Sequence, residues 1–157
     1  MTVLSTLPFS HAPTPTGAGI FSTSTAARDT ATADLRHFLG LEGLSREALL
    51  ALIGDAARER SWLALGEPNR KDLAGVTIVL AFIEDSTRTR TSFEIAAQRL
   101  GANTVVFSSA ASSLNKGETL LDTVRLFEAM GSALVVVRHP SSGAPVWLAR
   151  QLDRMGV

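Results

Sequence analysis

The sequence contains no cysteine. This absence excludes disulfide bonds, catalytic thiolates and cysteine-ligated zinc sites within the 157 residues. An excess of charge is missing as well, because 15 lysines and arginines balance 15 aspartates and glutamates. Nucleic-acid-binding domains usually carry a strong basic patch, so the composition favours a globular protein without a nucleic-acid partner.

Long apolar runs are also absent. No stretch approaches the roughly 18 apolar residues that a membrane-spanning helix needs. The N-terminus lacks a basic patch followed by an apolar segment, which is the pattern of a secretory signal. We therefore expect a cytoplasmic protein with no membrane partner.

The first 33 residues differ in composition from the rest of the chain. They are rich in Thr, Ser, Ala and Pro, and only His11, Arg28 and Asp29 carry ionisable side chains. Such a segment has too few large apolar residues to build a core. We predict a flexible extension over residues 1–33 and a folded domain over residues 34–157.

Helical and strand-like patterns alternate after Asp34. Ser45 is placed to cap the first helix, and the strand at 77–82 is apolar without alternation, as in a strand buried on both faces. The alternation predicts an α/β fold, with a parallel sheet, right-handed crossovers and helices on both faces. The predicted elements are a helix at 45–65, strands at 77–82, 104–107 and 133–137, and helices that carry Phe93 to Leu100, Leu120 to Phe127, and the segment from Pro145.

Polar loops follow all three predicted strands. They read DSTRTR at 85–90, SSAASSLNKGE at 108–118 and RHPSSG at 138–143. The carboxyl ends of parallel strands lie at one edge of a sheet, which is where such folds bind ligands. We therefore expect a binding site formed by these loops.

The segment STRTR at 86–90 has the composition of an anion site. Ser86, Thr87, Arg88 and Thr89 lie at a predicted helix N-terminus, where free amides and the helix dipole attract anions. An arginine fork and hydroxyl donors suit a phosphate group. The alternative is that Ser86 only caps the helix while Arg88 and Arg90 are solvated, and the sequence leaves both interpretations open.

Other ionisable residues in the loops have two interpretations each. Arg138 follows a strand and could supply a second arginine to the same ligand. Lys116 is a candidate third cation or an ordinary exposed lysine. His139 could act as an acid or base, but beside Pro140 the interpretation as a turn residue is favoured.

Acidic residues are scarce around these loops. We expect Glu94 and Glu118 to be the only acids nearby, and Glu94 to orient an arginine rather than abstract a proton. No paired-carboxylate site is visible. The sequence also lacks GxxxxGK[ST] and GxGxxG, so neither glycine-rich nucleotide-binding loop is indicated.

Three separated motifs carry a family resemblance. The segments STRTRTSFE, LNKGETLLDT and VVVRHPSSGAP occur in the order seen in the N-terminal half of aspartate carbamoyltransferases. The resemblance extends from about Asp34 to Val157. STRTR also resembles ornithine carbamoyltransferases, whereas KGETLLDT together with RHP favours the aspartate enzymes.

The resemblance implies roles for individual residues. Arg88 and Arg138 would be the catalytic residues, with Arg138 also contacting carbamoyl phosphate. Lys116 and Ser113 would contact aspartate from a neighbouring subunit of a homotrimer, although Ser112 is an alternative to Ser113. The residues that would hold the phosphate are Ser86, Thr87, Arg88 and Thr89.

The resemblance also implies a reaction. The aspartate amine would attack carbamoyl phosphate, giving N-carbamoyl-L-aspartate and phosphate for pyrimidine biosynthesis, without a metal or other cofactor. Preorganised arginine and hydroxyl donors would stabilise the oxyanion and the leaving phosphate. The two substrates are thus the partners that the resemblance implies.

The sequence departs from the family pattern in several places. The HPTQ-like motif and the C-terminal aspartate domain are missing, so we expect this chain alone to bind carbamoyl phosphate but not to catalyse transfer. A second chain could complete the site. Asp85 replaces a small residue or proline and would weaken phosphate binding if it pointed inward, while Trp147 replaces a frequent histidine. The alternatives are an ornithine carbamoyltransferase fragment and a non-catalytic anion-binding or assembly module.

Overall fold

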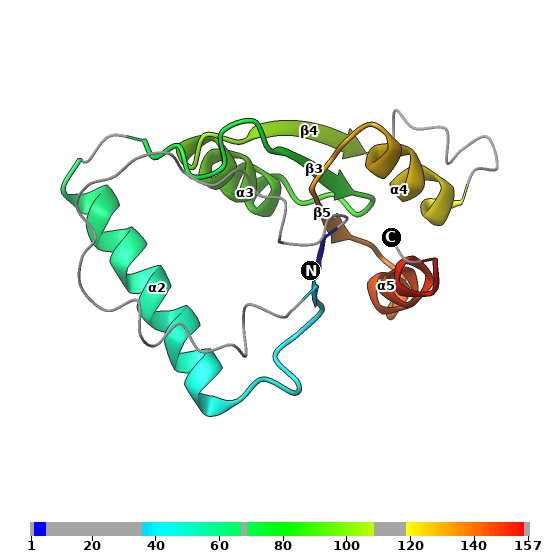
Figure 1. Ribbon diagram of the computed structural model, residues 1–157, viewed down its shortest axis with the longest axis horizontal. Coiled ribbons are helices and arrows are strands. Elements are labelled where there is room, and N and C mark those ends of the chain that lie inside the picture. Colours follow the sequence, from blue (N-terminus) through cyan, green and yellow to red (C-terminus); the bar gives the residue numbers. More distant parts are fainter. Residues whose placement is uncertain (1, 6–35, 67–68, 109–118, 156–157) are drawn as a thin grey trace. The chain divides into compact units, whose positions relative to one another are not determined.

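The computed structural model describes residues 2–5, 36–66, 69–108 and 119–155 (Figure 1). The chain divides into two compact units. One unit contains the sheet and helices α3 to α5, and the other contains helix α2. None of the helices in the described part of the chain is long and apolar enough to cross a membrane.

Helix α2, Arg46–Ala64, begins where the sequence predicts. The Ser45 hydroxyl accepts a hydrogen bond from the Ala48 amide at 3.1 Å, which confirms the predicted N-cap. Its apolar stripe is less covered than the helical spacing suggests. Leu52 is 37% exposed and Ile53 is 65% exposed, so the described residues leave much of this stripe open to solvent.

The sheet of the first unit has the strand order β2-β1-β5-β3-β4. Strand β3, Thr77–Phe82, pairs in parallel with β4, Asn103–Ser108, on one side and with β5, Leu134–Arg138, on the other. Each of these strands leads into a helix: α3, Thr87–Arg99; α4, Leu120–Ala129; and α5, Ala144–Arg154. The predicted α/β fold with a parallel sheet is confirmed.

Apolar side chains are buried on both faces of the sheet. Helices α4 and α5 cover one face, where Val124 and Leu148 pack with Val79 and Val135. Helix α3 covers the other face, where Ala97 belongs to the same cluster as Leu80 and Val136. Helices therefore lie on both faces, as the sequence predicts, because β3 and β5 are apolar at successive positions.

Two antiparallel strands extend the sheet beyond β5. Strand β1, Thr2–Ser5, pairs with β5 and also with β2, His37–Phe38. Within the predicted extension, the backbone of residues 2–5 pairs with the outer edge of β5, and the flexibility of the extension stays a prediction. Residues 6–33 of the predicted extension lie outside the described part.

Candidate anion-binding site at the sheet edge

The loops that follow β3 and β5 meet at one edge of the sheet. Phe82 and Arg138 are register partners at the carboxyl ends of these parallel strands. Beyond them, the Ile83 and Glu84 amides both donate to the Arg138 carbonyl, at 2.9 and 3.3 Å. The backbone thus brings Arg138 to the loop that carries the STRTR segment, as predicted.

Helix α3 begins within that segment and has an uncapped N-terminus. Ser86 occupies the N-cap position but makes no side-chain capping hydrogen bond. Its hydroxyl instead donates to the Thr89 hydroxyl oxygen at 2.8 Å. The alternative that Ser86 only caps the helix is therefore wrong, and the first-turn amides lack a side-chain acceptor from Ser86.

Arg138 is held by an acid that the sequence analysis missed. Its terminal nitrogen Nη2 donates to the Glu84 carboxylate oxygen Oε1 at 2.9 Å, with the two side chains 32% and 43% exposed. Among the described residues, the buried Nε atom of Arg138 has no hydrogen-bond partner. Glu84 thus fixes one end of the guanidinium group and leaves another donor unused.

The other acids near the loops behave differently from expectation. Contrary to the prediction, Glu94 and Glu118 are not the only acids nearby, since Glu84 contacts Arg138. Within the described residues, Glu94 makes no ion pair with Arg88 or Arg90, so its expected orienting contact is not seen. The position of Glu84 at a strand end was the available signal, but its pairing depends on the strand register.

The two arginines of the STRTR segment occupy different environments. Arg88 is exposed, whereas Arg90 is half-buried and its Nε atom has no hydrogen-bond partner in the part of the chain that the structure describes. The uncapped helix start and the unused Nε donors of Arg90 and Arg138 make this edge rich in donors. Because arginine donors and helix-start amides both favour negative charge, the arrangement suits an oxyanion such as phosphate.

His139 serves as a turn residue. Its Nδ1 atom accepts a hydrogen bond from the Ser141 amide at 2.9 Å, which confirms the favoured interpretation.

Asp85 is exposed to solvent. A hollow of about 430 Å³ lies beside this turn and is lined by residues that include His139, Gly143 and Trp147.

The remaining candidates lie outside the described residues. Lys116 and both serine candidates, Ser112 and Ser113, belong to residues 109–118. In the part of the chain that the structure describes, no group of three or more His, Asp or Glu side chains is arranged to hold a metal ion.

Comparison with known proteins places this edge in a family context. Residues 36–154 match the model of the aspartate/ornithine carbamoyltransferase carbamoyl-phosphate-binding domain. The chain belongs to this family. The match covers strands β2 to β5, helices α2 to α5 and both loops of the candidate site, but not strand β1.

Individual carbamoyltransferases extend the comparison. The catalytic subunits from Gluconobacter oxydans and Stenotrophomonas maltophilia are each 50% identical, over 119 and 127 residues, which are 75% and 80% of this chain. The chain spans only 38% and 40% of these two relatives. It therefore corresponds to less than half of their length.

Solved structures show the same fold. Aspartate transcarbamoylase from Trypanosoma cruzi in complex with carbamoyl phosphate has a TM-score of 0.64 and 38% identity, over 72% of this chain and 36% of that protein. Ornithine carbamoyltransferase from Pyrococcus furiosus has a TM-score of 0.50 and 32% identity, over 56% and 28%. The similarity is thus greater to the aspartate enzyme of this pair, in line with the KGETLLDT and RHP motifs.

Proposed function

We propose that this chain is a carbamoyl-phosphate-binding domain that takes part in carbamoyl transfer to L-aspartate. The observation that carries the proposal is the uncapped start of α3 beside the strand end that bears Arg138, whose Nε donor is unused. The Trypanosoma cruzi relative, which shares this fold, has been solved with carbamoyl phosphate and with carbamoyl phosphate and aspartate together. The ligands of this relative support carbamoyl phosphate and aspartate as the ligands of this chain.

In this proposal the phosphate group binds at the start of α3. The amides of Thr87, Arg88 and Thr89 supply donors, and the Ser86 and Thr89 hydroxyls already lie close to each other. The guanidinium group of Arg88 adds a charged fork from the same turn. A dianionic phosphate offers three oxygens to these groups.

Arg138 acts on the carbamoyl end and on the charge that develops during transfer. The aspartate amine forms a bond to the carbamoyl carbon, the bond from that carbon to the phosphate oxygen breaks, and the proton that the amine loses passes to the departing phosphate. Negative charge grows first on the former carbonyl oxygen and then on the leaving phosphate. Fixed donors lower the barrier because they need little reorganisation as this charge develops.

Several parts of the activity depend on groups outside the described residues or outside this chain. We place aspartate recognition on Lys116 and Ser113 of a neighbouring copy in a homotrimer. The expected setting is pyrimidine biosynthesis in the cytoplasm. This chain alone binds carbamoyl phosphate without turning it over.

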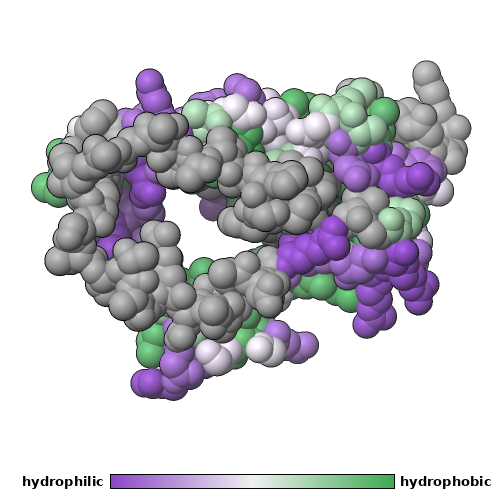
Figure 2. All heavy atoms as spheres, viewed as in Figure 1, coloured by the Kyte–Doolittle hydropathy of each residue, from purple (hydrophilic) through white to green (hydrophobic). Residues whose placement is uncertain are grey.

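Exposed apolar side chains support the association of copies. Val105 and Val106 on the edge strand β4 are 46% and 43% exposed, and Leu126 and Met130 at α4 are 49% and 72% exposed. Figure 2 shows hydrophobic residues reaching the described surface among hydrophilic ones. Burying these side chains against another copy of the chain would favour association of the copies.

A titration tests the binding function directly. Adding inorganic phosphate or carbamoyl phosphate to the folded chain should shift the amide resonances of residues 86–90 and of Arg138. We expect a dissociation constant of about 1 mM, corresponding to about 4 kcal/mol, because the open site is screened by water.

Three variants separate this site from general charge effects. Arg88→Ala and Arg138→Ala should abolish the shifts, whereas Arg150→Ala, on the exposed side of α5, should leave them unchanged. Absence of shifts in the folded wild-type chain would contradict the proposal, and so would equal losses in all three variants.

A further inference from the structure

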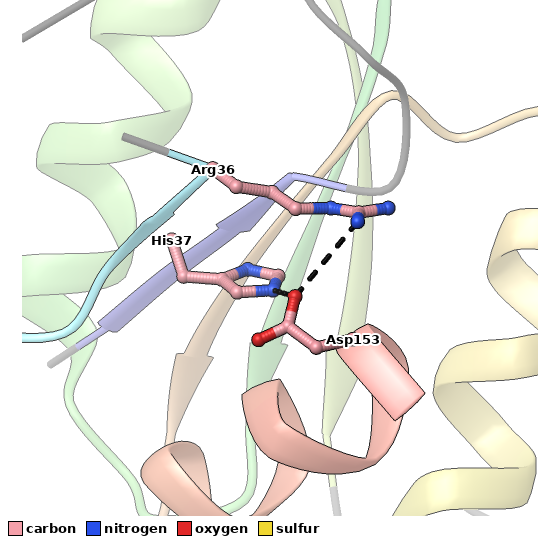
Figure 3. A network of polar contacts seen from close by, with 3 residues as sticks. All are labelled: Arg36, His37 and Asp153. Atoms are coloured by element: carbon pink, nitrogen blue, oxygen red, sulfur yellow. Dashed lines mark hydrogen bonds and ion pairs between the residues drawn. The ribbon is translucent and has the colours of Figure 1, made fainter. Parts of the chain in front are cut away.

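Asp85 differs from the other aspartates that the structure describes. Each of the others has a polar partner: Asp55 with Arg58, Asp72 with Arg70, Asp122 with Thr119, and Asp153 with Arg36 and His37. Figure 3 shows the last of these groups, in which Asp153 Oδ1 lies 3.1 Å from His37 Nε2. Asp85 is exposed and, in the described part of the chain, has no hydrogen bond or ion pair. No described side chain therefore neutralises its negative charge.

Asp85 lies directly before the candidate anion site. It precedes Ser86, the N-cap residue of α3, by one position. Consecutive Cα atoms are about 3.8 Å apart, so the carboxylate lies within roughly 6–10 Å of a phosphate group bound by the first-turn amides of α3. The Debye length is about 10 Å at 0.1 M salt and is longer in dilute solution. The charge of Asp85 therefore acts on any anion at this site.

The neighbouring acid Glu84 already compensates one arginine of the site. Its Oε1 atom accepts a hydrogen bond from Arg138 Nη2 at 2.9 Å, so this arginine adds little net charge. Arg88 and Arg90 supply further positive charge, and Asp85 offsets part of it. The site thus offers many hydrogen-bond donors but little excess positive charge. This balance favours a small phosphate ligand over a polyanion.

We propose that Asp85 is a specificity-determining residue that restricts the anion site to ligands with a single phosphate group. The inference rests on the proposed function, because it defines the substrate class of the same site. A phosphate chain gains negative charge with each further group, and Asp85 repels each of these charges. Carbamoyl phosphate instead joins one phosphate to an uncharged carbamoyl group. Asp85 thereby disfavours ligands such as nucleoside diphosphates and triphosphates.

Coulomb's law sets the size of the effect. At a separation of about 8 Å in dilute aqueous solution, each negative charge on the ligand costs roughly a factor of two in affinity. A phosphate with about two charges loses roughly fourfold, and a triphosphate with about twice that charge loses roughly sixteenfold. Asp85 therefore shifts the preference for phosphate over triphosphate by roughly fourfold.

A purely structural role for Asp85 predicts a different result. A negative charge at a helix start interacts favourably with the helix dipole. Loss of that interaction would lower the stability of α3, but it would not change the relative affinities of two anions. Ligand preference therefore distinguishes the two roles.

Titrations of the 157-residue chain at low ionic strength test the proposal. Inorganic phosphate and inorganic triphosphate are added separately at mildly alkaline pH, and the amide resonances of residues 86–90 are followed. Asp85→Asn should strengthen phosphate binding roughly fourfold and triphosphate binding roughly sixteenfold. Asp85→Glu keeps the charge and should retain the wild-type preference. In about 0.5 M salt the effects of Asp85→Asn should shrink to less than about twofold.

Asp72→Asn provides a matched control. Asp72 precedes β3, at the end of this strand opposite the anion site, and its substitution removes the same single negative charge. The six residues of β3 span about 20 Å. At this distance the control should change both affinities by less than about twofold.

Several results would overturn the proposal. They are equal strengthening of both anions by Asp85→Asn, an equally large effect of Asp72→Asn, loss of the preference in Asp85→Glu, and an Asp85→Asn effect that persists unchanged in high salt. Absence of shifts in every folded sample would contradict the proposed function and this inference with it. Phosphate-dependent shifts that do not depend on residue 85 would count only against the role of Asp85.

Discussion

The inner and outer sides of β5 follow different rules. On the inner side, β3 and β5 are parallel, and their neighbouring ends form the candidate site with Phe82 opposite Arg138. On the outer side, Thr2 pairs with Val137 in the opposite direction, from the far end of the chain. Local crossovers determine the first arrangement. The second depends on an edge that a distant segment can cover.

The largest expected effect on stability compares a core substitution on β3 with a substitution on β1, the outer neighbour of β5. Leu80 is fully buried on β3, so Leu80→Ala should lower the free energy of unfolding by about 2–5 kcal/mol. Val3→Pro should cost only about 1 kcal/mol, since it removes one ladder hydrogen bond. Urea unfolding measures both. Equal losses would mean that β1 is as integral to the fold as β3.

The next prediction separates a local backbone requirement from a tertiary one. Gly101 and Gly131 both have φ of +84°, and alanine in such a conformation costs about 1–2 kcal/mol. A Cβ atom at Gly101 would also lie 3.1 Å from Lys71 Cα, whereas a Cβ atom at Gly131 would have no described atom within 4 Å. Gly101→Ala should therefore lower the thermal midpoint more than Gly131→Ala. The opposite order would show that Lys71 moves aside without cost.

A smaller effect should separate two variants of Asp153. The His37 side chain is only 7% exposed and contacts Asp153, which is 52% exposed. Asp153→Ala would leave a buried ring nitrogen unpaired and should cost about 1 kcal/mol. Asp153→Asn retains an acceptor oxygen and should cost less. Amide exchange at Phe38 measures both, and equal acceleration in the two variants would show that charge rather than hydrogen bonding holds β2.

The smallest effect concerns the start of α4. The Thr119 hydroxyl donates to the Asp122 carboxylate at 2.6 Å, and the Thr119 amide donates to it at 3.2 Å. These hydrogen bonds lower the pKa of Asp122 below its ordinary 3.8. Because the folded pKa is the lower one, the stabilisation is present above pH 3.8 and is lost as the pH falls through the folded value.

Comparing Asp122→Asn with the wild type checks this dependence. The stability difference between the two proteins should be constant near neutral pH and should change only as the pH falls below 3.8. Thermal unfolding across that range measures it. A difference that stays the same down to the lowest pH would exclude ionisation of Asp122 as its source.

The sequence predicted the elements well wherever their signals were local. The strand at 77–82 has the predicted bounds, and β4 extends the prediction by one residue at each end. The turn role of His139 also follows from its neighbours. Glu84 was missed because its partner Arg138 lies 54 residues away, and only the strand register brings them together. The exposure of Leu52 and Ile53 was likewise hidden, since periodicity defines an apolar stripe but not what covers it.

The sequence by itself determined the alternation of strands and helices, the parallel α/β sheet and the edge where STRTR and Arg138 meet. Short-range periodicity, helix-end residues and the right-handed crossover encode these features. Only the tertiary structure decided that Ser86 does not cap α3, that Glu84 holds Arg138 and that β1 covers β5. The Glu84–Arg138 pair and the β1–β5 pairing depend on contacts between residues far apart in the sequence. The Ser86 hydroxyl has competing hydrogen-bond partners. Local sequence patterns specify neither the distant contacts nor the partner that Ser86 takes.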